Sequence, residues 1–390
     1  MAAGGVLATS LPGCALPDRG PPVPAGRAGE ASVLGIANER FLPSEGTSLM
    51  DAEFMAAMER QRHARGLATL AGLPPLQLLA ISGGGENGAF GAGLLCGWTE
   101  LGSRPTFDLV TGISTGALTA PFAFLGSRYD PQLRAVYTEI KPNEVLSKRS
   151  ITAALFDDAL ADNAPLFETI SRYVDDRMLA DIAAAYDTGR LLMVVSTDLD
   201  AQIPVVWNIG AIAKSGHPRA VDTVRRILLA SAAVPAAFPP TMIEVTLDGK
   251  IYQEMHVDGG TFAQAFLYPS ALTAKRRQRM RAGQPVGEAR AFIIRNGRLD
   301  PEWARVERRT LGIAGRAIST MIAAASVNDM IRIYNTTRRD GIGYNLAYMG
   351  RDFNEVLPEP FDPGYMRALF DYAYRQSRRG YPWATKPPAA

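Results

Sequence analysis

The sequence is most constrained by a pattern that occurs twice: a short apolar run, a turn rich in glycine, and then an apolar stretch suited to a helix. Short apolar runs bounded by glycine turns are typical of strands that are buried on both faces. Strands that alternate with helices form a parallel sheet covered by helices on both sides. The pattern therefore predicts a three-layer α/β/α fold with a mostly parallel central sheet. Its two copies run from Leu76 to Leu101 and from Phe107 to Leu125.

The rest of the 390-residue chain is compatible with one such domain. A hydrophobic content of 47% supports a large core, and a net charge of only +2 argues against a dedicated nucleic-acid binder. We expect a single domain over residues 48–385, with its motifs concentrated in 76–260. Residues 1–47 are expected to form a flexible leader, because residues 1–30 contain 6 glycines and 5 prolines.

Apolar periodicity predicts further elements along the domain. No apolar run of about 18 residues is free of charges and prolines, so no transmembrane helix is expected. For the basic run Lys275–Arg281, a solvated helix face is favoured over contact with anionic lipid. Helices are expected at 48–72, 130–140, 165–186, 219–233, 264–282, 310–334 and 363–379, and further strands at 191–196, 204–208, 242–247, 251–257 and 291–295.

The leader contains Leu11-Pro12-Gly13-Cys14-Ala15, which is similar to the cleavage site of bacterial lipoproteins. In those proteins the cysteine after a small residue becomes lipidated. The stretch before Cys14 is weakly apolar, but it lacks the usual basic residues. A lipidated Cys14 would anchor the protein in the bacterial cell envelope, on a membrane that faces the periplasm. If Cys14 is an incidental cysteine, the protein would be cytoplasmic or secreted.

The first glycine turn, Ser82–Gly88, has two interpretations. Its glycines satisfy the G-x-G-x-x-G pattern of dinucleotide-binding sites, in the expected strand–turn–helix context. However, the second strand ends in Thr111-Gly112 and lacks the acidic residue that would bind a ribose. Consecutive glycines at a helix N-terminus also let backbone N–H groups converge on a phosphate or an oxyanion. Gly83, Gly84 and Gly85 are thus candidate oxyanion donors.

The second glycine turn, Gly112-Ile113-Ser114-Thr115-Gly116, is a G-x-S-x-G motif. On a sharp strand-to-helix turn the serine has unusual backbone angles, and the flanking chains approach closely. Glycines two residues before and after the serine leave room for that approach. This predicts that Ser114 is a nucleophile at the carboxyl end of the sheet. The first turn would lie on the neighbouring strand, within reach of its oxyanion.

A serine nucleophile needs a base, and the chain has only 3 histidines. His63 and His217 lie in a helix before the sheet and in a polar turn, whereas His256 lies at the end of a strand. Asp258, in Asp258-Gly259-Gly260, is the better candidate, because it follows a strand where α/β sites form. In a dry site a carboxylate that is hydrogen-bonded to the serine can accept its proton.

Together these residues resemble the patatin-like phospholipase family. The resemblance rests on the glycine turn, the Ser114 motif, Asp258-Gly259-Gly260 and the block Ala230–Pro240, in that family's order and spacing. It implies a Ser114–Asp258 dyad without histidine, an oxyanion hole of Gly83, Gly84 and Gly85, and an acyl-Ser114 intermediate. The turn departs from the family at Ser82 and Asn87, where Asp and a basic residue are usual.

The resemblance implies a serine acyl hydrolase of the phospholipase A or lipid esterase type. Its partners would be a lipid or acyl-ester substrate and a membrane surface, with no nucleic acid, and no cofactor or metal is implied. Asp198 and Asp200 have no further ligand at metal spacing. Two alternatives stay open: a nucleotide- or phosphate-binding module that uses the Gly83–Gly88 turn, and a non-catalytic lipoprotein adaptor. The sequence does not determine the oligomeric state.

Overall fold

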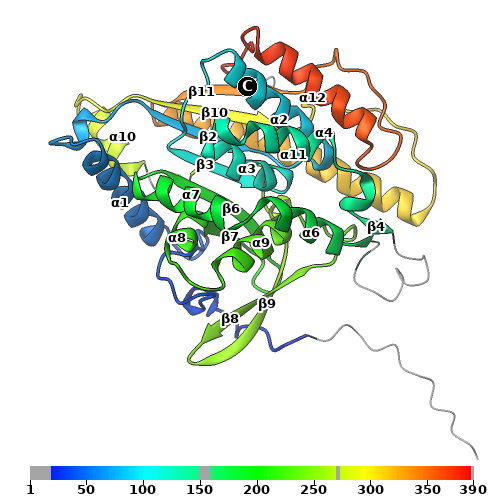
Figure 1. The fold of residues 1–390 in the computed structure, drawn as a ribbon, viewed down its shortest axis with the longest axis horizontal. Helices are drawn as coiled ribbons and strands as arrows, with labels where there is room; N and C mark the ends of the chain where they lie inside the picture. The colour runs from blue at the N-terminus through cyan, green and yellow to red at the C-terminus, as the bar shows by residue number, and fades with distance from the viewer. Residues whose placement is uncertain (1–18, 149–158, 160, 269–272, 388–390) are drawn as a thin grey trace, which may run out of the picture.

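The computed structural model describes residues 19–148, 159, 161–268 and 273–387. A central sheet has the strand order β1-β7-β6-β3-β2-β10-β11 (Figure 1). From β6 to β11 in this order, every neighbouring pair is parallel. The expected fold, with a mostly parallel central sheet, is thereby confirmed. The five parallel strands are β2 (Leu76–Ile81), β3 (Leu109–Ile113), β6 (Leu191–Asp198), β10 (Ala289–Arg295) and β11 (Gly343–Tyr348).

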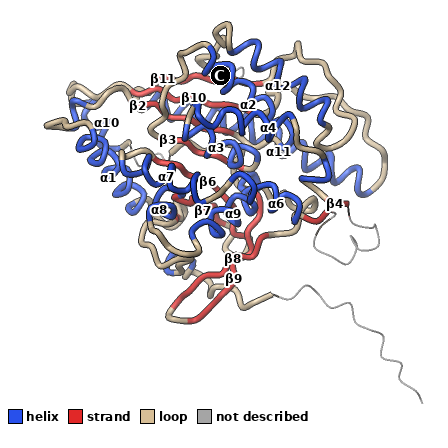
Figure 2. Tube along the Cα trace, in the orientation of Figure 1, coloured by secondary structure: helices blue, strands red, loops and turns tan. Residues whose placement is uncertain are grey.

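The other edge of the sheet is antiparallel. Strand β7 (Ile203–Asn208) pairs with β6, and the two-residue β1 (Arg40–Phe41) pairs with β7. The end of β9 (Lys250–Asp258) pairs with the end of β6, so that Asp258 lies opposite Ser196. Strand β9 also forms a long hairpin with β8 (Thr241–Leu247), which extends away from the body of the molecule (Figure 2). A separate short pair is formed by β4 (Ser147–Lys148) and β5 (Ala161–Asp162).

Helices cover both faces of the sheet because successive side chains of each strand point to opposite sides. In β2, Leu79 and Ile81 belong to one hydrophobic core, and Leu78 and Ala80 to the other. On the second face, α1 (Ser48–Ala64) and α11 (Thr310–Arg339) contribute to the core. The first face is covered by α2 (Gly88–Glu100), α3 (Thr115–Leu125), α4 (Asp130–Thr138), α6 (Ala164–Tyr173), α7 (Asp176–Asp187), α9 (Ala220–Ser231) and α12 (Pro363–Ser377) (Figure 1).

The structure corrects the expected boundary of the leader. Residues 19–47 are not a free tether, because they pack against the domain and supply β1. Arg40 forms a buried ion pair with Glu254, with 2.6 Å between Nη1 and Oε2. Phe41 is buried in the core as well. The glycine and proline content predicts that this segment forms no long helix or strand. The few apolar residues between them are nevertheless sufficient to hold the segment against the domain. Residues 1–18, with Cys14, lie outside the described residues.

Several expected elements end elsewhere than predicted. The helix expected at 165–186 is two helices, α6 and α7, separated at Val174-Asp175, where the Asp175 side chain caps α7. The helix expected at 264–282 is reduced to α10 (Ala274–Arg281), because residues before it join the active-site region. Helix α1 ends at Ala64 instead of residue 72. The sequence patterns missed β11 and the short α8 (Ile209–Lys214). None of the described helices is long and apolar enough to cross a membrane.

Candidate active site

Ser114 occupies the sharp turn between β3 and α3, as the G-x-S-x-G motif predicts. Its backbone has φ 56° and ψ −129°, a conformation that non-glycine residues rarely adopt. A Cβ on Gly112 would lie 2.4 Å from the carbonyl oxygen of Gly116. A Cβ on Gly116 would lie 2.2 Å from the carbonyl oxygen of Ile81. Backbone crowding therefore requires glycine at both positions, and the packed turn holds the serine in its strained conformation.

A second serine, Ser231, supports this turn through hydrogen bonds. The N–H of Ser114 donates a hydrogen bond to Oγ of Ser231 at 3.1 Å, and the Ser231 hydroxyl donates to the carbonyl of Val195 at 2.6 Å. Ser231 is completely buried at the end of α9. It thus joins the turn Gly112–Gly116, here called the elbow, to β6. The sequence contained it only as one residue of the Ala230–Pro240 block, with nothing to indicate this role.

Asp258 ends β9 and lies beside Ser114 in a buried environment. Its Oδ1 accepts a hydrogen bond of 2.6 Å from the N–H of Gly260. Burial raises the pKa of Asp258 to about 7, while hydrogen bonding from the Ser114 hydroxyl and the Gly260 N–H opposes the rise. Among the described residues, no well-aligned hydrogen bond reaches Oδ2, so the contact with the Ser114 hydroxyl is loose. Loose pairs of this kind are common in catalytic sites without substrate.

His256 is not placed to act on Ser114. It is fully buried, and its two ring nitrogens are both engaged. Nδ1 lies 2.9 Å from Oγ of Ser196, and Nε2 lies 3.1 Å from Oε2 of Glu254. The Arg40–Glu254 ion pair extends the same network. His256 therefore belongs to a structural polar cluster inside the antiparallel edge.

The first glycine turn lies next to Ser114, but its three glycines have different roles. The N–H of Gly83 donates to the carbonyl of Gln264 at 3.2 Å, which corrects the expectation that Gly83 supplies an oxyanion donor. A Cβ on Gly83 would lie 3.2 Å from Cβ of Ser114, so this glycine provides room for the serine. Gly84 and Gly85 have φ of 156° and 57°. Within the described residues no acceptor occupies the N–H of either one.

The carbonyl of Gly83 is fixed by two donors. The Ser82 hydroxyl donates to it at 2.7 Å, and Nη1 of Arg295 donates at 2.9 Å. In a trans peptide the C=O of one residue and the N–H of the next point in opposite directions. Arg295 and Ser82 therefore hold the N–H of Gly84 pointing away from themselves. Burial lowers the pKa of Arg295 to about 10, and the side chain remains cationic at neutral pH.

Asn296 completes the support of this turn. Its N–H donates to Oγ of Ser82, and its Nδ2 donates to the carbonyl of Ser82, both at 2.9 Å. Its Oδ1 accepts from the N–H of Gly91 in α2 at 3.0 Å. A Cβ on Gly84 would lie 2.1 Å from the carbonyl oxygen of Asn296. The sequence held no local signal for Arg295 or Asn296, because both follow a strand that lies far away along the chain.

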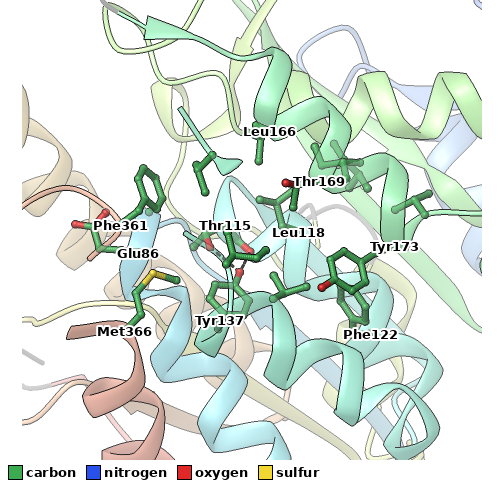
Figure 3. A pocket seen from close by; sticks show the side chains of 17 residues that line it. Glu86, Thr115, Leu118, Phe122, Tyr137, Leu166, Thr169, Tyr173, Phe361 and Met366 are labelled. Atoms are coloured by element: carbon green, nitrogen blue, oxygen red, sulfur yellow. Dashed lines mark hydrogen bonds between the residues drawn. The ribbon is translucent and has the colours of Figure 1, made fainter. Parts of the chain in front are cut away.

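An apolar pocket opens beside the two turns. Figure 3 shows Thr115 near its centre, Phe122 and Tyr173 toward one end, and Glu86 with Phe361 at the other. The Thr115 hydroxyl is 2.7 Å from the Tyr137 hydroxyl, so the polar atoms of this wall are paired. Burial raises the pKa of Glu86. The pocket suits a hydrocarbon chain that starts next to Ser114.

Comparison with known proteins identifies this part of the chain. Residues 79–268 match the model of the patatin-like phospholipase family. These residues are thus similar to the patatin-like phospholipases. The family is one of ester-bond hydrolases with lipid substrates, which agrees with the fold and with the resemblance noted in the sequence.

Individual relatives of this patatin-like domain match over smaller parts. The chain is 41% identical over 80 residues to a protein named cUMP-AMP-activated phospholipase from Escherichia coli. That match covers 20% of this chain and 24% of the relative, so the chain spans about a quarter of its length. Among solved structures, VipD from Legionella pneumophila superposes with a TM-score of 0.38 at 11% identity, over 79% of this chain and 66% of VipD.

The matched residues do not contain the whole site. Ser114, Ser231 and Asp258 lie within the patatin-like domain match, as do all the glycines of both turns. Arg295 and Asn296 lie beyond its end at residue 268. The first glycine turn is therefore supported in part by residues outside the matched range.

The described residues contain no candidate metal site. No group of three or more His, Cys, Asp or Glu among the described residues is arranged to hold a metal ion. Oδ1 of Asp198 accepts from the N–H of Asp200 at 2.9 Å, and Asp200 pairs with Arg19. Both aspartates thus have contacts within the fold.

Proposed function

We propose that this protein is a serine acyl hydrolase that cleaves acyl esters of lipids, with Ser114 as nucleophile and Asp258 as base. One observation carries the proposal: Ser114 is held in a strained turn beside a buried carboxylate whose pKa is raised to about 7. A carboxylate with a raised pKa is a stronger base, and the sharp turn presents the serine side chain at the start of α3. Both features are expensive for stability and are typical of active sites.

In this mechanism Asp258 accepts the proton of the Ser114 hydroxyl while Oγ attacks the ester carbonyl carbon. The carbonyl π electrons move to its oxygen, and the N–H groups of Gly84 and Gly85 stabilise that oxyanion. The N–H of Thr115, at the start of α3, is a third donor. Collapse of the intermediate breaks the ester C–O bond, and the proton on Asp258 passes to the leaving alcohol. Water then attacks the acyl-enzyme by the same route and releases the fatty acid and Ser114.

The apolar pocket supports a lipid substrate. Thr115 follows the nucleophile directly and also lines the pocket, so an acyl group on Ser114 would extend along this wall. Leu118, Phe122 and Ile170 line the same space and present hydrocarbon to the chain. Burying an acyl chain here would supply binding energy of roughly 0.8 kcal/mol per CH₂ group.

The alternative of a nucleotide-binding module has less support. The N–H of Gly83 is already engaged by Gln264, and Gly85 and Glu86 face an apolar pocket. Within the described part of the chain Glu86 forms no ion pair, and its carboxylate, when ionised, would repel a pyrophosphate at this position. The alternative of a non-catalytic adaptor is favoured by no specific contact. A membrane surface as partner, and lipidation at Cys14, remain proposals from the sequence, and mass spectrometry of the mature protein would test the latter.

The central experiment compares the wild-type protein with Ser114→Ala. Hydrolysis of a short p-nitrophenyl ester should fall to background in Ser114→Ala, because the acyl-enzyme cannot form. A fluorophosphonate probe should label Ser114 in the wild-type protein alone. The matched control is Ser127→Ala, an exposed serine after α3, which should keep both properties. Full turnover by Ser114→Ala would refute the proposed mechanism.

A further inference from the structure

Helix α11 differs sharply between its two halves. In the C-terminal half, Met330 and Ile333 are buried against the sheet. In the N-terminal half, Ile313 is 50% exposed and Met321 is 70% exposed. Figure 1 shows this yellow-orange helix extending at the right of the view. One end of α11 thus belongs to the core, and the other end is exposed to solvent.

The exposed half is apolar in composition. From Gly312 to Ala325 it contains a single charged residue, Arg316. At helical spacing, Ile313, Ala317 and Met321 fall on one side, with Ile318 flanking them. Exposed apolar helix faces of this kind mark surfaces that bind another apolar phase.

The segment before the helix adds an aromatic residue and positive charge. Trp303 is 90% exposed and Val306 is 43% exposed. Over residues 302–316, four arginines stand against two glutamates. Tryptophan and arginine beside an apolar helix face are typical of segments that lie in the interface of a lipid bilayer. We call Trp303, Val306, Ile313, Ile318 and Met321, with Arg305, Arg308, Arg309 and Arg316, the α11 ridge.

The segment before α11 approaches the Glu86 end of the pocket through Glu302. Nη2 of Arg316 donates to the carbonyl of Glu302, which ties the helix to the preceding segment. Glu302 and the pocket residue Glu86 both act on the pKa of Tyr365. The Tyr365 hydroxyl in turn donates to Oδ1 of Asn87 at 2.7 Å, in the first glycine turn. A lipid surface on the ridge would therefore lie near the Glu86 end of the pocket.

We propose that the α11 ridge docks the protein on an anionic lipid bilayer, with the apolar side chains among the acyl chains and the arginines at the phosphates. Charge decides this occupant: a second copy of the chain would bring like-charged arginines together, whereas anionic lipid complements them. The consequence for access of substrate to Ser114 rests on the proposed function, but the docking itself does not.

Vesicle co-sedimentation tests the proposal in the full-length chain. All variants carry Ser114→Ala, so that binding is measured without lipid hydrolysis. The protein should bind vesicles of phosphatidylcholine and phosphatidylglycerol, and bind pure phosphatidylcholine vesicles much more weakly. Ile313→Asp with Met321→Asp should weaken binding by at least about tenfold, since two charges would enter the apolar interface. Arg308→Ala should weaken binding to the anionic vesicles by about fivefold. The control Ile251→Asp, an equally exposed isoleucine in the β8–β9 hairpin, should bind as the parent does.

A second measurement separates docking from catalysis and from self-association. With Ser114 intact, the ridge variants should hydrolyse the soluble p-nitrophenyl ester at the parental rate, while their rate on anionic vesicles should fall in step with binding. Light scattering after gel filtration reports the oligomeric state. Unchanged vesicle binding in Ile313→Asp with Met321→Asp would overturn the proposal. A dimer that this variant dissociates, without loss of vesicle binding, would identify the ridge as a contact between copies instead.

Discussion

The two glycine turns look alike in sequence but present different chemistry. At the second turn the strain falls on Ser114, whose φ is 56°, and the flanking glycines only make room. At the first turn Gly84 and Gly85 themselves have positive φ, and among the described residues no acceptor occupies their backbone N–H groups. One turn therefore presents a side chain and the other presents the backbone. Parallel pairing of β2 with β3 brings the Ser114 side chain and these backbone N–H groups together at one end of the sheet.

The two turns also differ in what holds them. The elbow is supported by close neighbours of the fold that belong to the matched domain: Ile81, Ser231 and Val195. The first turn depends on Arg295 and Asn296, which lie after β10 and outside the match. The comparison teaches that crowding mainly fixes the conformation of Ser114, whereas distant polar contacts fix the orientation of the Gly84 N–H group. Each of the following substitutions tests one side of this difference.

The largest effect is expected from Gly116→Ala. The new Cβ would lie 2.2 Å from the carbonyl oxygen of Ile81, a backbone atom that cannot move without displacing β2. We expect a loss of more than about 4 kcal/mol in the free energy of unfolding, and no activity. Chemical denaturation and ester hydrolysis measure both. Gly287→Ala, where nothing lies within 4 Å, is the control and should be near neutral. A stable, active Gly116→Ala protein would show that the elbow is not set by crowding.

Asp258→Asn tests the base beside the elbow. Removing the base should lower kcat/KM by about 10²- to 10⁴-fold, because the amide cannot accept the serine proton. In the wild-type protein kcat/KM should rise with pH through about 7, where Asp258 loses its proton. A pH–rate profile that stays flat from pH 5 to 9 would contradict the assignment.

The same substitution has an opposite effect on stability. Since folding raises the pKa of Asp258 from 3.8 to about 7, the folded state binds the proton more tightly than the unfolded state. Its contribution to the free energy of unfolding is therefore present at low pH and is lost as pH rises from about 4 to 7, by an amount on the order of 4 kcal/mol. Asp258→Asn should lack this loss and be more stable than wild type at pH 8. Denaturant midpoints at pH 5 and 8 measure the difference.

Arg295→Met tests the first turn. Without the guanidinium, the Gly83–Gly84 peptide loses a donor that orients the Gly84 N–H, and we expect kcat to fall by about 10- to 100-fold with little change in KM. Fluorophosphonate labelling of Ser114 should slow in parallel, and Arg295→Lys should recover part of the rate. Arg190→Met is the control, since Arg190 is a partly buried arginine that donates to backbone carbonyls away from the site. If both variants lose stability but neither loses kcat, Arg295 is structural only.

The smallest effect is expected from Gly85→Ala. No atom lies within 4 Å of the added Cβ, so only the φ of 57° disfavours it. The cost should be about 1–2 kcal/mol in stability, and kcat should fall only a few-fold. Gly84→Ala is the companion, because its Cβ would meet the Asn296 carbonyl oxygen at 2.1 Å. Equal behaviour of the two variants would remove the distinction between neighbouring glycines of this turn.

The predictions from sequence succeeded where the cause is local. Apolar runs and glycine spacing predicted β2, β3 and the two turns, and the family match agrees with the fold. They failed where contacts between distant segments decide. Residues 19–47 looked like a tether but dock through a buried ion pair, Arg40–Glu254, whose partners are more than two hundred residues apart. The helix expected from residue 264 instead begins at Ala274, because the Gln264 carbonyl accepts from the N–H of Gly83 and its side chain donates to the carbonyl of Gly260.

The sequence by itself determined where a strained serine, a glycine turn and an Asp-Gly-Gly turn would occur, since backbone crowding and positive φ depend on a few consecutive residues. Only the tertiary structure decided how each is used. Gly83 only makes room for Ser114, because its N–H is already hydrogen-bonded to the carbonyl of Gln264. Arg295 became the support of the Gly84 N–H because β10 pairs with β2 in register, with Ile294 opposite Ile81. Strand order places these groups side by side, and no local pattern in the chain records strand order.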